Sequence, residues 1–163
     1  MTSWKKWKHE HRALYGRGGG LLGHQLPRLD DPTLIVCPKC AKRASVVPVN
    51  EETVRANCFA CGFSTEAPIL PRGYAWGAET PTDGFFGCEL WLRTNCEGHS
   101  LWAFNQRHLT FLEDFVAARL RERRRDPYWR NASLGSRLPQ WIKSSDNRES
   151  LLKAIEKLKK MAE

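Results

Sequence analysis

Two pairs of cysteines are the residues in this sequence whose spacing most clearly predicts chemistry. Cys37 and Cys40 form one Cys-x-x-Cys pair, Cys58 and Cys61 form another, and residues 41–57 lie between them. Each short spacing lets two thiolates from one tight turn reach the same ion, and two such turns complete a tetrahedron. The four cysteines therefore predict a metal centre with zinc as its ion.

A centre with four cysteine ligands has no open coordination position. We therefore expect one structural Zn²⁺ that stabilises the fold and does not activate water. A second metal site could be formed by three further residues, Cys88, Cys96 and His99. These have no partner pair, and the simpler interpretation is a small apolar side chain at position 88 and a turn at 96–99.

The cysteines must be positioned by the short β-branched stretches around them. We expect three strands, at 34–36, 44–49 and 53–57. Gly62 follows the last cysteine and suits the tight turn of a knuckle. Residues 34–66 thus resemble the zinc-ribbon superfamily, with the rubredoxin-like knuckles of transcription-factor-B-type ribbons. The resemblance implies a small β unit held together by metal, and it departs from the family at Ala41, where many ribbons carry glycine.

Basic residues surround the expected metal centre. Lys42, Arg43 and Arg55 lie close to the cysteines in sequence, as does Lys39. Four thiolates on Zn²⁺ carry a formal charge of about −2, which these cations are expected to offset. The alternative is that they face a phosphate backbone, with Phe59 at the tip of the second knuckle available for stacking on a base.

A second unit follows a stretch rich in proline and glycine. We expect a linker or a long ordered loop at 67–85, with a domain boundary inside it. The second unit, 86–163, begins with a predicted hairpin whose strands are 90–94 and 100–104. Alternation divides its apolar side chains between two faces, with Leu90, Leu92, Leu101 and Ala103 on one and Trp91, Trp102 and Phe104 on the other.

Helical periodicity begins after the hairpin. Asn105 is expected to cap a helix over 106–124, whose apolar stripe is Leu109, Leu112, Val116 and Leu120. Further helical segments are expected at 131–138, 140–143 and 147–161. The last of these would bury Leu151, Ile155 and Leu158. The predicted fold class is therefore α+β, with an N-terminal zinc ribbon followed by a domain of a β-hairpin and three helices.

Arginines crowd the end of the long predicted helix. The cluster and the aromatic residues beside it are Arg119, Arg121, Arg123, Arg124, Arg125, Tyr128 and Trp129. They could form a solvated helix terminus, which suits the negative end of the helix dipole. The alternative is a set of bidentate phosphate contacts with aromatic neighbours.

The second unit also carries a resemblance of its own. The motifs are Leu-Trp-Leu-Arg-Thr at 90–94, Leu-Trp-Ala-Phe-Asn at 101–105, His-Leu-Thr-Phe-Leu-Glu at 108–113, Arg-Leu-Arg-Glu-Arg at 119–123 and Ser-Arg-Leu-Pro-Gln-Trp-Ile-Lys at 136–143. Residues 86–159 are similar to a group of small bacterial zinc-ribbon proteins without an assigned role. This implies a ribbon joined to a helical domain in a bacterial cytosolic protein, and it implies no mechanism.

Composition narrows the partners and the compartment. The chain has 163 residues and a formal net charge of +8, which favours anionic partners, nucleic acid first. Residues 1–33 are predicted to be a basic, weakly ordered arm without the apolar core of a secretory signal. No apolar run approaches the roughly 20 residues of a membrane span. We therefore expect a cytoplasmic protein, in which cysteines act as metal ligands and not as disulfides.

Two functions remain open at this point. One is a non-enzymatic module that associates with nucleic acid through its basic residues; the other is an adaptor that docks on proteins through its ribbon and exposed aromatic residues. An enzyme is not expected, because the chain has no phosphate-binding glycine loop and no metal signature with an open position. Candidate carboxylate pairs, Glu89 with Glu97 and Glu113 with Asp114, look like ordinary surface or capping acids.

Overall fold

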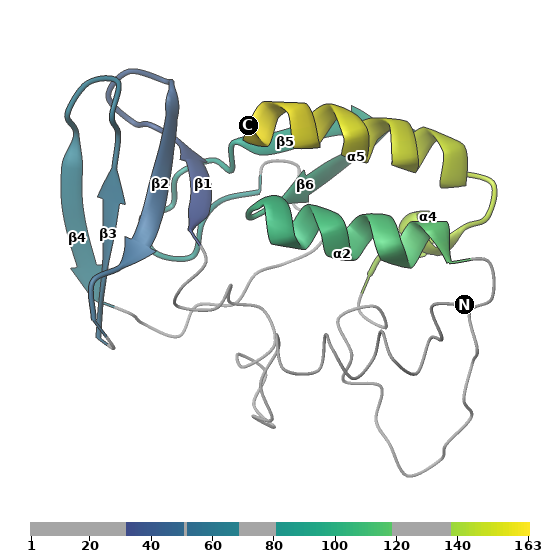
Figure 1. The fold of residues 1–163 in the computed structure, drawn as a ribbon, viewed down its shortest axis with the longest axis horizontal. Coiled ribbons are helices and arrows are strands. Elements are labelled where there is room, and N and C mark those ends of the chain that lie inside the picture. The colour runs from purple at the N-terminus through teal and green to yellow at the C-terminus, as the bar shows by residue number, and fades with distance from the viewer. Residues whose placement is uncertain (1–31, 51, 69–80, 119–137) are drawn as a thin grey trace, which may run out of the picture.

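The computed structural model describes residues 32–50, 52–68, 81–118 and 138–163, and within them the chain is α+β, as predicted (Figure 1). The described strands and helices are β1 (Thr33–Val36), β2 (Arg43–Pro48), β3 (Thr53–Asn57), β4 (Ser64–Pro68), β5 (Leu92–Cys96), β6 (His99–Ala103), α2 (Gln106–Ala117), α4 (Gln140–Lys143) and α5 (Arg148–Ala162). The strands form a four-stranded antiparallel sheet in the order β1-β2-β3-β4 and a separate β5-β6 hairpin.

The four-stranded sheet contains the predicted ribbon and adds a strand to it. Alternate residues of β2 and β3 point to one face, where Ala44, Val46, Val54 and Ala56 are buried. These side chains are small, so the sheet's own apolar face offers little area to bury. It needs apolar partners from elsewhere in the chain.

Those partners come from the second unit through β1. The β1 backbone pairs with β2 on one side, and on the other the Leu34 N–H donates to the Phe104 carbonyl at 2.8 Å. The Val36 N–H likewise donates to the Glu89 carbonyl at 2.8 Å. Ile35 lies between them, fully buried in one apolar cluster with Leu90 and with Trp102, which is only 2% exposed. Burying a large apolar side chain contributes about 1.5–3 kcal/mol, so this cluster is a substantial part of the ribbon's stability.

The β5-β6 hairpin is tighter than the sequence suggested. Its strands pair Leu92 with Ala103 and Cys96 with His99, which leaves a two-residue turn in place of the predicted loop 95–99. Glu97 and Gly98 have φ values of 53° and 76°, the pair of positive angles that a type I′ turn requires. The predicted strands at 90–94 and 100–104 were therefore displaced by one or two residues.

The predicted faces of the hairpin need two corrections. Leu92, Leu101 and Ala103 share one apolar cluster with the helices, as expected. Leu90, which was placed with them, instead lies in the ribbon cluster with Trp102 and Phe104, whereas Trp91, which was placed with those two, packs against the helical cluster. The predicted alternation fails because β5 begins only at Leu92, so the period-two spacing of a strand does not extend back to Leu90. The backbone is irregular where the strand begins, since the Arg93 N–H donates to the Trp91 carbonyl at 3.1 Å.

Helix α2 begins as predicted and ends earlier. The Asn105 side chain accepts a hydrogen bond from the His108 N–H at 2.9 Å, which confirms it as the N-cap. The helix ends at Ala117, whereas the sequence predicted a helix to residue 124, because Ala118 turns to ψ 118°. The guanidinium of Arg148 donates to the Ala118 carbonyl at 3.2 Å and satisfies a carbonyl at this early helix end.

Helices α2 and α5 lie side by side and antiparallel, with the β5-β6 hairpin against α5 (Figure 1). The predicted stripe of α5 is confirmed, since Leu151, Ile155 and Leu158 are all fully buried. The expected segment at 140–143 is the single-turn helix α4. Residues 1–31 of the predicted arm (1–33) lie outside the described residues, and Thr33 instead belongs to strand β1 and is buried. Residues 131–137 of the predicted helix over 131–138 also lie outside the described residues.

A buried histidine completes the interior beneath β6. His108 stacks on Phe104 at 5.2 Å between ring centroids, and its Nδ1 accepts a hydrogen bond from the Phe104 N–H at 3.3 Å. Burial lowers the pKa of His108 to about 4. The imidazole is therefore neutral in the folded chain at ordinary pH.

Candidate metal centre

Two matching turns bring the four cysteines together. In the first, the Ala41 N–H donates to the Cys37 carbonyl at 2.9 Å; in the second, the Gly62 N–H donates to the Cys58 carbonyl at 2.9 Å. Ala41 and Gly62 have φ values of 57° and 71°. The two knuckles thus have the same backbone, and the alanine that departed from the ribbon pattern occupies a left-handed conformation that glycine adopts more readily.

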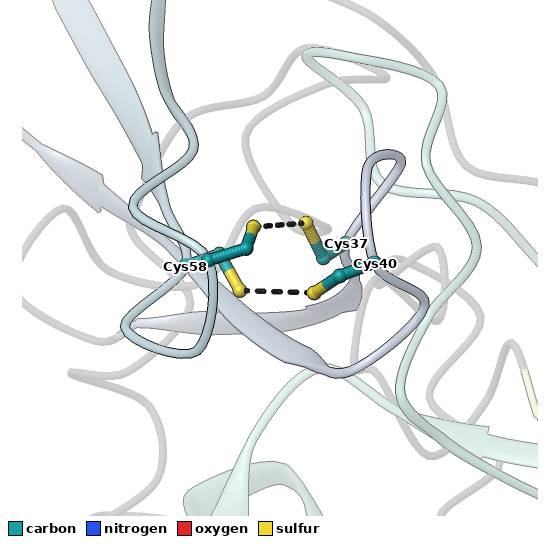
Figure 2. Close-up of side chains that lie close together, drawn as sticks. Cys37, Cys40 and Cys58 are labelled. Carbon is teal, nitrogen blue, oxygen red and sulfur yellow. Dashed lines mark hydrogen bonds between the residues drawn. The ribbon is translucent and has the colours of Figure 1, made fainter.

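The sulfur atoms face one another across a small space, as Figure 2 shows. The Cys37 Sγ lies 3.7 Å from the Cys61 Sγ, and the Cys40 Sγ lies 3.6 Å from the Cys58 Sγ. All four sulfurs lie within 4.8 Å of one another. A tetrahedron with metal–sulfur bonds of about 2.3 Å has sulfurs about 3.8 Å apart, so the four side chains fit one tetrahedral ion.

The electrostatics of the site also favour a cation. Although burial raises it, hydrogen bonds from the backbone and from neighbouring thiols lower the pKa of Cys37 to about 7. The opposite holds at Cys40, where burial and the neighbouring thiols outweigh a backbone hydrogen bond and raise the pKa to about 12. One thiol therefore ionises readily and the next resists, because thiolates this close repel one another unless a cation lies between them.

Backbone groups supply the remaining support of the knuckles. The Lys39 N–H points at the Cys37 Sγ, 3.4 Å away. The Cys37 N–H donates to the Lys42 carbonyl and the Cys58 N–H to the Phe63 carbonyl, each closing its turn. N–H groups directed at sulfur stabilise thiolate, so the loops are shaped for a charged ligand set.

The basic residues predicted beside the cysteines divide into two kinds. Arg43 donates to the Ala162 carbonyl at 3.0 Å and so covers the end of α5, and Arg55 forms an ion pair with Glu66 at 2.6 Å. Lys39 and Lys42 are exposed and make no side-chain hydrogen bond or ion pair within the described residues. Phe59 is 96% exposed at the tip of the second knuckle.

The other candidate ligands among the described residues are not brought to this centre. Among the described residues the four knuckle cysteines are the only group of three or more candidate ligands that could hold a metal. Cys96 is buried in the helical cluster, Cys88 packs against the ribbon cluster, and His99 stacks on Trp141 at 4.7 Å. The arginine and aromatic cluster lies outside the described residues: Arg119, Arg121, Arg123, Arg124, Arg125, Tyr128 and Trp129.

The remaining thiols are partly or fully buried, and two of the candidate carboxylates form ion pairs. Burial raises the pKa of both Cys88 and Cys96, with a smaller contribution from nearby acids, so neither thiol is a ready nucleophile. Of the candidate carboxylates, Glu89 pairs with Arg93 and Glu113 with Lys159. These pairings agree with their interpretation as surface acids.

Sequence reasoning missed Asp83, which organises the approach to the second unit. Its carboxylate is buried and accepts hydrogen bonds from the N–H groups of Phe85, Phe86 and Cys88 at 2.6–2.8 Å. This arrangement holds the stretch that leads to Leu90 and the ribbon cluster. The Asp-Gly pair at 83–84 was the available signal, because aspartate in a turn commonly accepts from backbone two or three residues later.

No family model, curated protein or solved structure matches this chain. None of the described helices has the length and apolar character that crossing a membrane requires. The four-cysteine geometry is consistent with a zinc-ribbon-like site and stands on the coordinates alone.

Proposed function

We propose that this chain is a non-catalytic nucleic-acid-binding module whose ribbon is held together by one structural Zn²⁺. The assignment of zinc rests on the ligand set, since four thiolates in a tetrahedral arrangement are typical of closed structural zinc sites. The ion would carry no open position, so its role is to fold the knuckles. A reducing compartment such as the cytoplasm would keep the four thiols available.

One observation carries the proposal of nucleic acid as the partner. Of the described lysines and arginines, only Lys39 and Lys42 have side chains without a hydrogen-bond or ion-pair partner. Both belong to the first knuckle, and the nearly fully exposed Phe59 belongs to the second, whose cysteines share one sulfur cluster with those of the first. Available cations and an exposed aromatic ring are the combination with which proteins hold nucleic acid chains.

The number of lysine contacts sets the expected salt dependence of binding, and the charge of the metal centre opposes those contacts. Four thiolates on Zn²⁺ carry a formal charge of about −2, which partly cancels the field of the two lysines. Each phosphate contact of a single strand contributes about −0.7 to the slope of log Kobs against log salt concentration. Two lysine contacts therefore predict a contribution of about −1.4, and removal of either lysine should reduce the magnitude of the slope by about 0.7.

The test is anisotropy of labelled oligonucleotides, titrated with the zinc-loaded chain at several salt concentrations. Lys39→Ala and Lys42→Ala should each weaken binding and flatten the slope. Lys153→Ala is the matched control, because Lys153 is exposed on α5 and paired with Glu149. Absence of binding even at about 50 mM salt, where phosphate contacts are strong, would refute the proposal.

The second candidate function, a protein adaptor, is favoured by the exposure of Phe59 alone. A large apolar side chain held in solvent is a potential anchor for a protein partner. Recovery of one stoichiometric protein after nuclease treatment, lost in Phe59→Ala, would support it. The available charges of the first knuckle are the reason to place nucleic acid first.

A further inference from the structure

We propose that the knuckle end of the ribbon binds single-stranded nucleic acid by stacking an unpaired base on Phe59, an inference that rests on the nucleic-acid-binding function proposed above. The knuckle end is defined as the two turns Pro38–Lys39 and Phe59–Ala60 together with Lys42. All five side chains are exposed.

The backbone that carries Phe59 is held by the turn of the second knuckle. Its neighbours Cys58 and Cys61 point into the metal centre, and the Gly62 N–H closes the turn by donating to the Cys58 carbonyl at 2.9 Å. Most phenylalanine side chains are buried, so a phenylalanine ring in solvent does not contribute the usual apolar stabilisation to the fold. Because its backbone is held by the ligands on either side, little backbone entropy is lost when a planar group covers the ring, and the ordering cost is that of the Phe59 side chain.

The surroundings of Phe59 leave its face accessible. Ala60 and Pro38 are small exposed residues, and the other exposed large apolar side chain of the described residues, Val49, lies at the β2-β3 turn. That turn is at the opposite end of the strands that carry the cysteines. A protein partner would need a broader apolar patch around its anchor, whereas a single base needs one ring.

The same surface does not suit a duplex. In double-stranded DNA the faces of the bases are stacked on one another, and proteins read their edges with a helix or a two-stranded ribbon inserted into the major groove. The knuckle end offers two short turns and one ring. A single strand exposes base faces for the ring and phosphates for Lys39 and Lys42, and it uses all three residues at once.

The experiment compares four probes of equal length by anisotropy: a labelled oligothymidine, an oligouridine, a mixed-sequence duplex and an oligonucleotide with abasic residues. The zinc-loaded full chain should bind both single strands more tightly than the duplex. Phe59→Ala should weaken single-strand binding by about tenfold, as loss of one stacked base does. Phe59→Trp should bind the single strands about as tightly as wild type. The abasic probe should bind wild type and Phe59→Ala with equal affinity.

Val49→Ala is the matched control, since it also truncates an exposed apolar side chain, and it should leave affinity unchanged. Zinc content and circular dichroism of Phe59→Ala should equal those of wild type, because the Phe59 side chain is 96% exposed. If Phe59→Ala binds the single strand as tightly as wild type while Lys39→Ala and Lys42→Ala bind more weakly, stacking is refuted and nucleic-acid binding stands. If no probe binds, both proposals fail. If only recovery of a protein depends on Phe59, the adaptor replaces them.

Discussion

The left-handed residue of the first knuckle gives the sharpest quantitative prediction. Ala41 has a φ of 57°, whereas the matching residue of the second knuckle, Gly62, has a φ of 71°. A left-handed conformation costs an L-residue roughly 1–2 kcal/mol. Replacing alanine by glycine also increases the entropy of the unfolded chain, which offsets about 0.4–1 kcal/mol. Ala41→Gly should therefore stabilise the zinc-bound ribbon by about 0.5–1 kcal/mol.

The reverse change at the second knuckle should have the reverse effect. No atom lies within 4 Å of a Cβ placed on Gly62, so Gly62→Ala introduces no clash and its cost is conformational alone. We expect a loss of about 0.5–1 kcal/mol, and the double variant Ala41→Gly with Gly62→Ala should return close to wild type. Ala60→Gly is the control, because Ala60 lies in a knuckle turn without a positive φ and should lose stability on the change to glycine.

Zinc affinity is the direct assay, because folding of a small metal-held unit and binding of its metal are linked. Competition against a chelator should give a zinc dissociation constant about two- to fivefold lower for Ala41→Gly and higher by a similar factor for Gly62→Ala, since 1.4 kcal/mol corresponds to tenfold. Circular dichroism melting in the presence of zinc should follow the same order. A change of the same sign for Ala41→Gly and Ala60→Gly would refute the reasoning.

Three further outcomes test the interior and the hairpin turn. Removing zinc with a chelator should speed hydrogen exchange at the Leu34 and Val36 amides, because β1 bonds to the second unit while sharing a core with the cysteines; unchanged protection, read by NMR, would show that β1 does not depend on the metal. Burial lowers the pKa of His108 in the folded chain from 6.5 to about 4, so between these pH values the unfolded chain binds a proton that the folded chain does not. The His108 contribution to the free energy of unfolding of wild type should therefore fall by about 3 kcal/mol as the pH falls from 6.5 to about 4. Urea unfolding at each pH should show that the free energy of unfolding of His108→Phe lacks this decrease. Protonation of the cysteine thiolates should lower the free energy of unfolding equally in both proteins. Glu97→Asn should increase the free energy of unfolding by about 0.5 kcal/mol, since asparagine tolerates the positive φ of the type I′ turn better than glutamate. Thermal melting should show this as a higher melting temperature.

Much of the local structure was predictable because it depends on neighbours in sequence. The knuckle spacing fixed the four ligands, the Asn105 cap needed only the start of an apolar period, and the stripe of α5 followed from its 3.6-residue repeat. The end of α2 was not predictable from its own residues. It ends beside Arg148, which is thirty positions away in sequence, and no local signal reports that contact.

The larger omission concerned how the ribbon and the second unit meet. A two-sided apolar hairpin indicated that both faces are covered, but it did not indicate that the ribbon covers one of them. Leu90 was assigned to the wrong face because its placement depends on a backbone bridge to Ile35 in β1. Asp83 was missed for a similar reason, since its importance depends on the loop that it fixes and not on its residue type.

The charges of the ribbon make the strongest argument about where the chain acts. Four basic residues flank the cysteines in sequence, and sequence alone left the same two roles open for all of them, offsetting the thiolate charge or facing a phosphate backbone. The fold separates them: Arg43 covers the carboxyl end of α5 and Arg55 neutralises Glu66, so both stabilise the chain. Lys39 and Lys42 stabilise no contact within the described residues and lie at the end of the sheet far from Val49. A metal ion bound by both knuckles would therefore also fix the positions of the backbone segments that carry two available cations and one exposed ring, which is how the proposed structural zinc would support the proposed binding of nucleic acid.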